Sequence, residues 1–534
     1  MKKVIKKVFA IATAILLTSC TSSLHESSNN QSESQNSYST SEVQNFREFA
    51  DGYKYYDFNT RYKKIKEQYP NKTILIWAVD YGVRYEEEIN KYLNDKNTDY
   101  VICFKDFAYD SNKMYNDKGN WATSYAELLE REMNNHEQID IISTGMMYAN
   151  YDAFFNTYHY FSKKGWLSPI NNYLETTKSG VKLYNLMPKN YWKTLELNKK
   201  IYGFDGSMSC LRYTAGYQLN ASLCDDLAID YKKISGSYTE TIKTLGNISK
   251  ENNLQFSIGL LENLSMYTNY DFITNCVYIN DEGKIVNIYE SEDAKELFEE
   301  IYRQFKQGCF VNTNRTPTDL NSFLGASTYA TCGEYTNNGI RTNMFYGLSS
   351  TSQSVESYKI YPEKFNTIHS STTATGISSS SEHKDLAFDA LAKIMTDEKL
   401  NNLICFGFNY SLDNDGCIQP KGYYNTMGFE NKLIRKPFSG LELSNMNSLF
   451  KTAFENSKLT SDVGFYFNNE KVSKQINETE KTIISLIADF PSKKYASSEN
   501  FLKTLNKALY DAGLQEVLDE ANRQLEEYHN KNNF

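Results

Sequence analysis

The sequence predicts an α/β protein of two lobes followed by a helical C-terminal region. From Thr73 onward, continuous apolar runs of strand length alternate with amphipathic helices, the pattern of a sheet covered by helices. The 534 residues are enough for roughly two to four folding units with sizeable cores. Gly (26) and Pro (8) are scarce, which excludes collagen-like and mainly disordered chains.

The first elements set the topology. Apolar strands are expected at Ile74–Val79 and Tyr100–Phe104, and a third at Ile139–Gly145. Amphipathic helices are expected between them, at Tyr85–Leu93 and Ser124–Met133. Strand–helix–strand order with short loops indicates a parallel sheet with right-handed crossovers, and ligands bind beyond the carboxyl ends of such strands.

The rest of the chain continues this mixture. Thr239 is a plausible N-cap of one helix, and Ser291 caps another whose apolar residues share one face. Strands are expected at 200–205 and 211–219, a hairpin at 277–286, and helices at 239–251, 291–307, 382–396 and 500–529.

The N-terminus has the features of an export signal. Four lysines among the first seven residues precede a ten-residue apolar core, Val8–Leu17, well short of the ~20 residues of a membrane-spanning helix. Leu17-Thr18-Ser19-Cys20 resembles the lipobox of bacterial lipoproteins. Residues 1–19 are therefore expected to be a signal peptide and Cys20 the lipidated residue; the alternative is an ordinary secretory signal with a chance Cys.

Residues 20–45 form the expected tether. Beyond Cys20 this stretch is rich in Ser and Asn and has few apolar residues, so it cannot bury enough surface to offset its chain entropy. The formal net charge of the chain is −9, which gives no overall basic footprint for nucleic acid. An acidic folded body held off a membrane by a flexible spacer is the resulting expectation.

Cysteine and histidine usage indicates no metal or redox site. No Cys-x-x-Cys pair and no Cys/His cluster with zinc spacing is present, and the six His make no i,i+4 pair. Cys405 and Cys417 are a local disulfide candidate, with buried free thiols as an equally good interpretation. Asp413–Gly416 is a hairpin turn rather than a calcium loop, because it lacks alternating ligands.

The sequence also carries no catalytic motif of the common kinds. G-x-S-x-G, H-E-x-x-H and the P-loop lysine are all absent. A glycoside hydrolase would need two carboxyl groups facing each other across a cleft, a pairing that sequence spacing does not reveal. We therefore expect no catalytic residue, no metal and no cofactor.

Several segments, taken in order, resemble one family: the extracellular solute-binding proteins of bacterial ABC importers, maltose-binding-like family 1. The C-terminal tail resembles a domain of unknown function carried by one lipoprotein subfamily. The segments that carry the resemblance are Gly165–Ile170 (GWLSPI), Tyr202–Phe204, Tyr217–Asp226, Ser237–Lys250, Cys332–Tyr335, Thr375–Ser381, Gly464–Phe467 and Phe501–Glu526.

The resemblance implies a two-lobed, periplasmic-binding-protein-like clamp with three hinge crossings. On this map the amino lobe comprises 46–207 and 335–375, and the carboxyl lobe comprises 208–334 and 376–534. The crossings are expected near Asp205–Met208, Cys332–Tyr335 and Thr375–Ile377. Gly206, Gly333 and Gly376 lie at these positions, where glycine would tolerate the dihedral changes of a hinge.

A sugar ligand needs aromatic rings for its C–H faces and carboxylates or amides for its hydroxyls. Residues of that character fall at the expected cleft edges, although each of the 42 Tyr is more often a packing residue. Trp77, in mid-strand, is expected in the core. The predicted ligand-binding residues are Asp80, Tyr81, Thr144, Met146, Asp205, Arg212, Glu334, Tyr335, Tyr466 and Phe467.

The resemblance implies a monomeric, lipid-anchored substrate-binding protein on the extracytoplasmic face of the cell membrane. It would pass a small-molecule solute, an oligosaccharide in the first instance, to the transmembrane subunits of an ABC permease. It would perform no chemistry and bind no nucleic acid. The alternatives are a secreted glycan-degrading enzyme and a peptide-binding receptor or adhesin of the same fold.

Overall fold

In the computed structural model of the chain, the first strands pair as a largely parallel sheet. Strand β3 (Thr73–Val79) lies parallel to β4 (Tyr100–Asp106) and to β5 (Ile141–Ser143), and β18 (Thr375–Ile377) closes the order β18-β5-β3-β4 antiparallel to β5. The predicted parallel sheet is confirmed. The structure describes residues 46–48, 53–79, 83–107, 125–144, 157–211, 213–234, 236–259, 261, 264–312, 322–331, 340–348, 351–360, 367–421, 430–439, 444–460 and 462–532.

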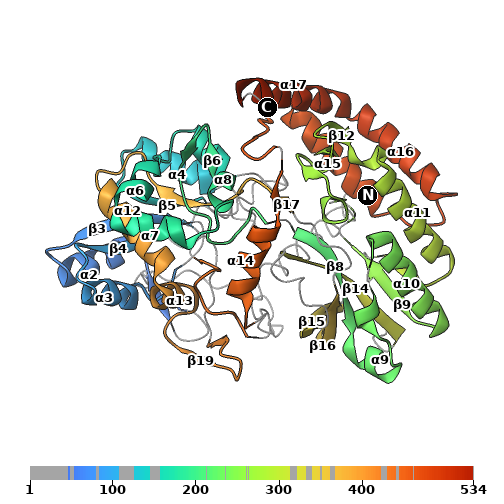
Figure 1. The fold of residues 1–534 in the computed structure, drawn as a ribbon, viewed down its shortest axis with the longest axis horizontal. Helices are drawn as coiled ribbons and strands as arrows, with labels where there is room; N and C mark the ends of the chain where they lie inside the picture. Colours follow the sequence, from blue (N-terminus) through green and yellow to red (C-terminus); the bar gives the residue numbers. More distant parts are fainter. Residues whose placement is uncertain are drawn as a thin grey trace, which may run out of the picture. The chain divides into compact units, whose positions relative to one another are not determined.

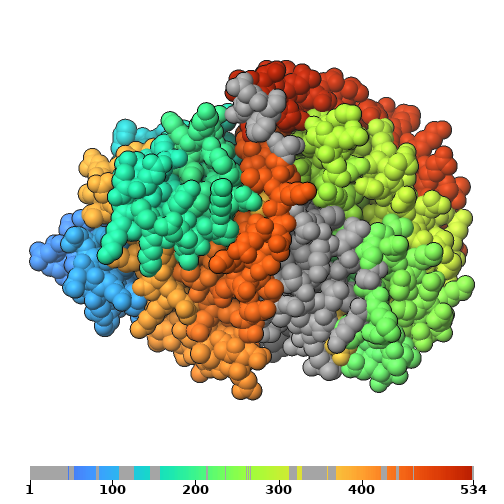
Figure 2. All heavy atoms as spheres, viewed as in Figure 1, coloured from blue at the N-terminus to red at the C-terminus, as the bar shows by residue number. Residues whose placement is uncertain are grey.

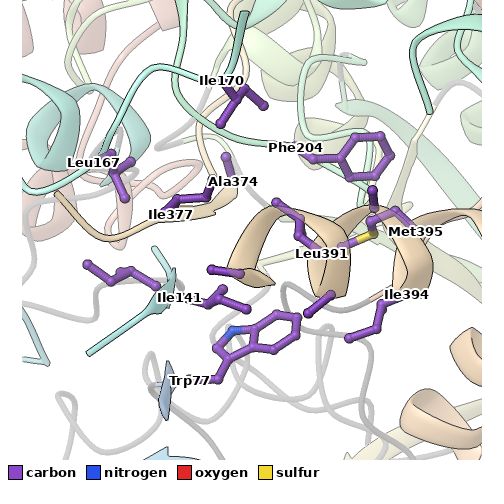
Figure 3. Packing of buried hydrophobic residues seen from close by; sticks show 14 of the residues in the cluster. Trp77, Ile141, Leu167, Ile170, Phe204, Ala374, Ile377, Leu391, Ile394 and Met395 are labelled. Carbon is purple, nitrogen blue, oxygen red and sulfur yellow. The ribbon is translucent and has the colours of Figure 1, made fainter. Parts of the chain in front are cut away.

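A first hydrophobic core surrounds this sheet. Trp77 lies fully buried in it, as predicted, and its indole N–H donates to Ser143 Oγ at 2.9 Å. Figure 3 shows the α12 side chains Leu391 and Ile394 beside Trp77. The helices that contribute buried residues to this core are α3 (Glu86–Asp95), α4 (Tyr125–Asn134), α5 (Thr157–Lys163), α6 (Asn171–Thr176), α7 (Lys178–Leu186), α8 (Tyr191–Thr194), α12 (Lys384–Thr396), α13 (Glu398–Phe406) and α14 (Met446–Asn456).

Smaller elements complete this part of the chain. Helix α2 (Phe58–Gln68) packs Ile65 against the outer face of β3 and β4 in a separate small cluster. Short strand pairs are β1 (Phe46–Glu48) with β2 (Lys54–Tyr56), β6 (Glu196–Leu197) with β7 (Lys200–Ile201), and β19 (Tyr410–Leu412) with β20 (Ile418–Pro420).

The β19–β20 pair is the hairpin predicted around Asp413. The Asp413 carboxylate accepts hydrogen bonds from the backbone N–H groups of Asp415 and Cys417, at 3.0 and 2.8 Å, and so closes the turn.

A second core forms around a six-stranded sheet with the order β13-β9-β14-β8-β16-β15. Its strands are β8 (Tyr213–Asn220), β9 (Gln255–Ile258), β13 (Phe310–Asn312), β14 (Phe323–Thr331), β15 (Ile340–Leu348) and β16 (Thr351–Ile360). The elements beside it are α9 (Ala221–Asp226), α10 (Tyr238–Glu251), α11 (Glu292–Lys306) and a small sheet of β10 (Asp271–Phe272), β11 (Val277–Ile279) and β12 (Ile285–Asn287).

Three C-terminal helices pack on this second core: α15 (Ser473–Ile487), α16 (Ser498–Asp511) and α17 (Leu514–Asn532). Helix α16 lies beside α11, as Figure 1 shows. Both helices are visible at the molecular surface in Figure 2. The helical stretch predicted for 500–529 is two helices. Gly513, with φ +99°, separates them, a backbone conformation that favours glycine.

Helix caps agree with the sequence in one case and differ in the other. Ser291 caps α11 as predicted, and its hydroxyl accepts from Ala294 N–H at 3.1 Å. Helix α10, in contrast, begins two residues earlier than Thr239 implied. Ser237 is its N-cap, and Glu240 completes a reciprocal capping box that satisfies two terminal N–H groups.

The cores divide the chain at positions that differ from the predicted lobe boundaries. Strands β15 and β16 extend the second sheet, because β16 pairs with β8 through Ile360, whereas residues 335–375 were expected in the amino lobe. Helices α12–α14, expected in the carboxyl lobe, bury their apolar faces in the first core. The second core then resumes at Val472.

The seven cysteines in the described part of the chain are buried free thiols, Cys405 and Cys417 among them. The free-thiol interpretation is therefore the correct one for this pair. No helix in the described ranges is long and apolar enough to cross a membrane. The signal peptide, the tether and Cys20 lie outside the described residues.

Candidate functional site

In the described part of the chain, three segments join the two cores. Going along the chain, the first core reaches Leu211 and the second begins at Ala215; the second core reaches Tyr358 and the first resumes at Ile368. The last passage runs from Phe454, in the first core, to Val472 in the second. Three crossings are therefore present among the described residues, but only the first lies near its predicted position. Thr375–Ile377 is strand β18 of the first sheet, and Cys332–Tyr335 lies outside the described residues. We call the three passages the first, second and third crossing segments.

Hydrogen bonds hold the three crossing segments side by side. Ile368 is the centre of this arrangement, since it bridges to Leu211 and its carbonyl accepts from Thr460 N–H at 3.0 Å. Strand β17 (Thr367–Ile368) pairs in parallel with β21 (Lys458–Leu459). The neighbouring His369 donates its backbone N–H to Cys210 O at 2.9 Å. The links between the cores thus form one small sheet-like bundle.

Asp205 organises the entry to the first crossing segment. It is 2% exposed, and its carboxylate accepts hydrogen bonds from Ser207 Oγ at 2.6 Å and from the N–H and Oγ of Ser209 at 2.8 and 2.6 Å. Burial raises the pKa of Asp205, and these donors oppose that rise. Ser209 Oγ also accepts from Thr372 N–H at 2.9 Å, which ties this stretch to the connection between β17 and β18 (Thr375–Ile377).

Thr144, at the end of β5, is also engaged within the protein. It is fully buried, and its hydroxyl oxygen lies 3.0 Å from Thr157 Oγ1 and accepts from Ala374 N–H at 3.0 Å. Thr144 and Asp205 make these hydrogen bonds within the chain itself, and a direct contact of either residue with a ligand stays a prediction.

Tyr466 and Phe467 lie in the third crossing segment and face different cores. The half-buried Tyr466 ring meets His159 on α5 edge to face, with centroids 5.5 Å apart, and Lys163 lies over the same ring. Burial lowers the pKa of His159 to about 3, so this imidazole is neutral at physiological pH. Phe467 packs against the second core. This pair therefore joins the C-terminal helices to both cores.

Six other predicted ligand-binding residues lie outside the described residues. In the sequence they lie within four residues of a described strand: after β3, after β5, before β8 or after β14. These residues are Asp80, Tyr81, Met146, Arg212, Glu334 and Tyr335.

The sequence reasoning missed a titratable cluster at the crossing. His369, directly after the second crossing segment, places Nδ1 2.8 Å from Asp271 Oδ1, on β10 of the second core. Asp462, in the third segment, is close enough for Asp271 to raise its pKa and for His369 to lower it; burial is the largest influence and raises that pKa to about 7. No spacing in the sequence links these three residues, because each comes from a different segment.

The sequence reasoning also missed an aromatic cluster beyond the end of β3. The Tyr85 ring lies 5.1 Å from the Phe408 ring in an edge-to-face arrangement and 5.1 Å from the Tyr53 ring. Arg84 places its guanidinium 5.7 Å from the Tyr53 centroid. A Tyr shortly after a predicted strand is the one signal that could have pointed to this cluster.

The described ranges hold no group of three or more His, Cys, Asp and Glu side chains arranged to bind a metal ion. What the described site offers is therefore a bundle of linking segments, buried hydrogen-bond networks and exposed aromatic surface.

Comparison with known proteins identifies the C-terminal region. Residues 462–530 match DUF3502, a domain of unknown function. This match covers the end of the third crossing segment and the helices α15–α17, and it confirms the resemblance of the tail. No curated protein matches the chain.

Solved structures match most of the chain. An N-glycan transport solute-binding protein (NgtS) from Streptococcus pneumoniae superposes with a TM-score of 0.62 at 17% identity, covering 86% of this chain and 99% of that one. Complexes of that protein with Man1GlcNAc and Man5GlcNAc give TM-scores of 0.52 and 0.51, at 16% and 17% identity and the same coverage. The chain therefore shares the fold of that protein, and the predicted α/β, two-lobed fold is confirmed, with the DUF3502 match at the C-terminus.

Proposed function

We propose that this chain is a lipid-anchored, monomeric substrate-binding protein of an ABC importer, which captures an oligosaccharide between its two lobes and delivers it to a permease. The observation that carries the proposal is the bundle of three crossing segments. In the described residues, two separately packed cores are linked by three adjacent chain segments, an arrangement that allows the cores to move as rigid bodies about that junction, as hinge closure around a ligand requires.

An oligosaccharide is the ligand class with most support. The protein of similar fold described above was solved with Man1GlcNAc and with Man5GlcNAc. The chain's 42 Tyr and 30 Phe provide many flat rings on which sugar C–H faces could stack. Mannose-containing glycans are therefore the first ligands to test, and no catalytic step is assigned to the protein.

Anchoring to the extracytoplasmic face of the cell membrane follows from the N-terminal sequence. Cleavage before Cys20 and lipidation of its thiol would leave the Ser-rich residues 21–45 as the spacer between bilayer and folded body. The substitution Cys20→Ala should move the protein from the membrane fraction to the soluble extracytoplasmic fraction. Unchanged membrane association of this variant would refute the anchor.

The binding function is tested with a panel of mannose, glucose and fructose oligosaccharides and short peptides. A ligand that binds only the folded chain raises its melting temperature; at 100 times Kd the added stability is about 2.7 kcal/mol. Calorimetry then gives the stoichiometry, chromatography of the recovered glycan tests for cleavage, and solution scattering tests for compaction on binding. Stoichiometric binding with compaction and intact glycan is expected. Glycan cleavage would replace this function with a glycan-degrading enzyme, and preference for peptides would replace the ligand class.

A further inference from the structure

The most exposed large apolar side chain in the described part of the structure is Phe408, at 58% of its full accessible area. It follows α13 and precedes β19, and its ring contacts the buried Tyr85 ring at an interplanar angle of 80°. A flat apolar ring that is both exposed and held by a buried neighbour is presented to solvent in a fixed orientation.

The backbone beneath this ring has a positive φ at two residues. Tyr85 has φ +62° at the start of α3, a left-handed conformation that is strained for a non-glycine residue. Its N–H donates to the Tyr53 hydroxyl at 3.1 Å. Gly407 has φ +71°, and a Cβ there would lie 2.4 Å from Tyr85 Cε2. Both features keep the Tyr85 ring under Phe408.

The place of this cluster in the fold is that of a ligand site. Tyr85 follows the carboxyl end of β3, and Asp106 ends the parallel neighbour β4 at the same edge. In α/β sheets, ligands bind beyond this edge. Arg84, beside the Tyr53 ring, adds guanidinium donors of the kind that hydrogen-bond hydroxyl oxygens.

We infer that Phe408, supported by Tyr85 and Tyr53, is a stacking platform for one sugar ring of the bound oligosaccharide. This assignment rests on the proposed function and names the part of the amino-terminal sheet edge that takes part in it. The exposed face of the Phe408 ring would contact the apolar C–H face of a pyranose, and Arg84 would donate to its hydroxyls. A sugar suits this combination because it offers both an apolar face and hydroxyl acceptors.

The test uses the full chain and calorimetry with Man5GlcNAc as the probe, and the other oligosaccharides of the panel if that glycan does not bind. Covering about half of a Phe side chain implies that Phe408→Ala weakens binding about tenfold. Phe408→Trp keeps a flat ring and should retain wild-type affinity, whereas Phe408→Leu, which keeps apolar area but has no ring face, should weaken binding to a level between wild type and the Ala variant. The matched control is Tyr184→Ala, which removes another exposed ring, 46% accessible and stacked on Trp192.

The outcomes separate the two proposals. A wild-type chain that binds sugar, with Phe408→Ala and Phe408→Leu weakened and Phe408→Trp and Tyr184→Ala unchanged, supports the platform. Equal affinities of wild type and Phe408→Ala would overturn the platform and leave the proposed function intact. Equal weakening by Tyr184→Ala would also overturn it, since the loss would then not be specific to this ring. A wild-type chain that binds none of the oligosaccharides would overturn both.

Discussion

Raising the pH from about 5 to about 8 should destabilise the folded chain through Asp462. Burial raises the pKa of this carboxyl group from 3.8 to about 7; the charge of Asp271 adds to the rise, while His369 and the Thr460 hydroxyl oppose it. Asp462 also contributes to the raised pKa of Tyr528 on α17. The group is therefore protonated in the folded chain over a pH range in which it is ionised in the unfolded chain.

The sign and size follow from proton linkage. Between pH 3.8 and about 7 the folded state binds the extra proton, so the free energy of unfolding falls as the pH rises. This loss is complete once the pH exceeds the folded-state pKa. One pKa unit is worth about 1.4 kcal/mol, so the full effect has an upper limit of about 4 kcal/mol. The substitution Asp462→Asn removes the ionisation and with it this part of the pH dependence.

Urea denaturation of wild type, Asp462→Asn and the control Asp415→Asn at several pH values measures the effect. Asp415 lies in the exposed turn between β19 and β20, far along the chain from the crossing. We expect the Asp462→Asn variant to gain stability relative to wild type as the pH rises from about 5 to about 8, and the control to follow wild type. A stability difference between Asp462→Asn and wild type that is constant with pH would refute the reasoning.

Three further predictions concern residues that the structure holds in place. Glu86→Ala leaves the buried Arg61, now 2.8 Å from the Glu86 carboxylate, without its ion-pair partner and should cost about 3–5 kcal/mol in urea denaturation; a loss below 1 kcal/mol would contradict this. Gly376→Ala places a Cβ 2.2 Å from Tyr202 O and should lower the melting temperature, because overpacking would cost about 1–3 kcal/mol. An unchanged melting temperature would show that β18 and the backbone at Tyr202 can move apart freely. Burial raises the pKa of the Cys276 thiol to about 11, so alkylation at pH 8 should modify it only in denaturant; modification of the native chain would show that this part of the second core opens readily.

Elements with a local signal were predictable from the sequence. The run ILIWAV became β3, since a continuous apolar run of strand length that contains β-branched residues is typical of a strand covered on both faces. Ser291 was identified as a cap because a hydroxyl before an acidic first turn satisfies free N–H groups at a helix start. These patterns are complete within a few residues, so no knowledge of distant contacts is needed to interpret them.

The lobe boundaries depend on distant contacts, and this is why they were harder to predict. Residues 351–360 contain many polar side chains, and their place in the second sheet is set by pairing with β8, which lies far earlier in the chain. Helix α12 has an apolar face that either core could bury. The sequence specifies that such a face is buried but not which core receives it, since hydrophobic burial is not directional.

The glycines at the predicted crossings also depend on distant contacts, in this case on the close approach of two backbone segments. Gly206 and Gly376 were expected to serve hinge motion through free dihedral angles, but neither has a positive φ. A Cβ on Gly206 would lie 1.6 Å from Glu430 O, and one on Gly376 would lie 2.2 Å from Tyr202 O. Both positions therefore require glycine because two backbone segments approach closely. We therefore expect hinge bending at the three crossing segments, where the chain leaves one core for the other. Gly206 and Gly376 would keep the first core rigid during that motion.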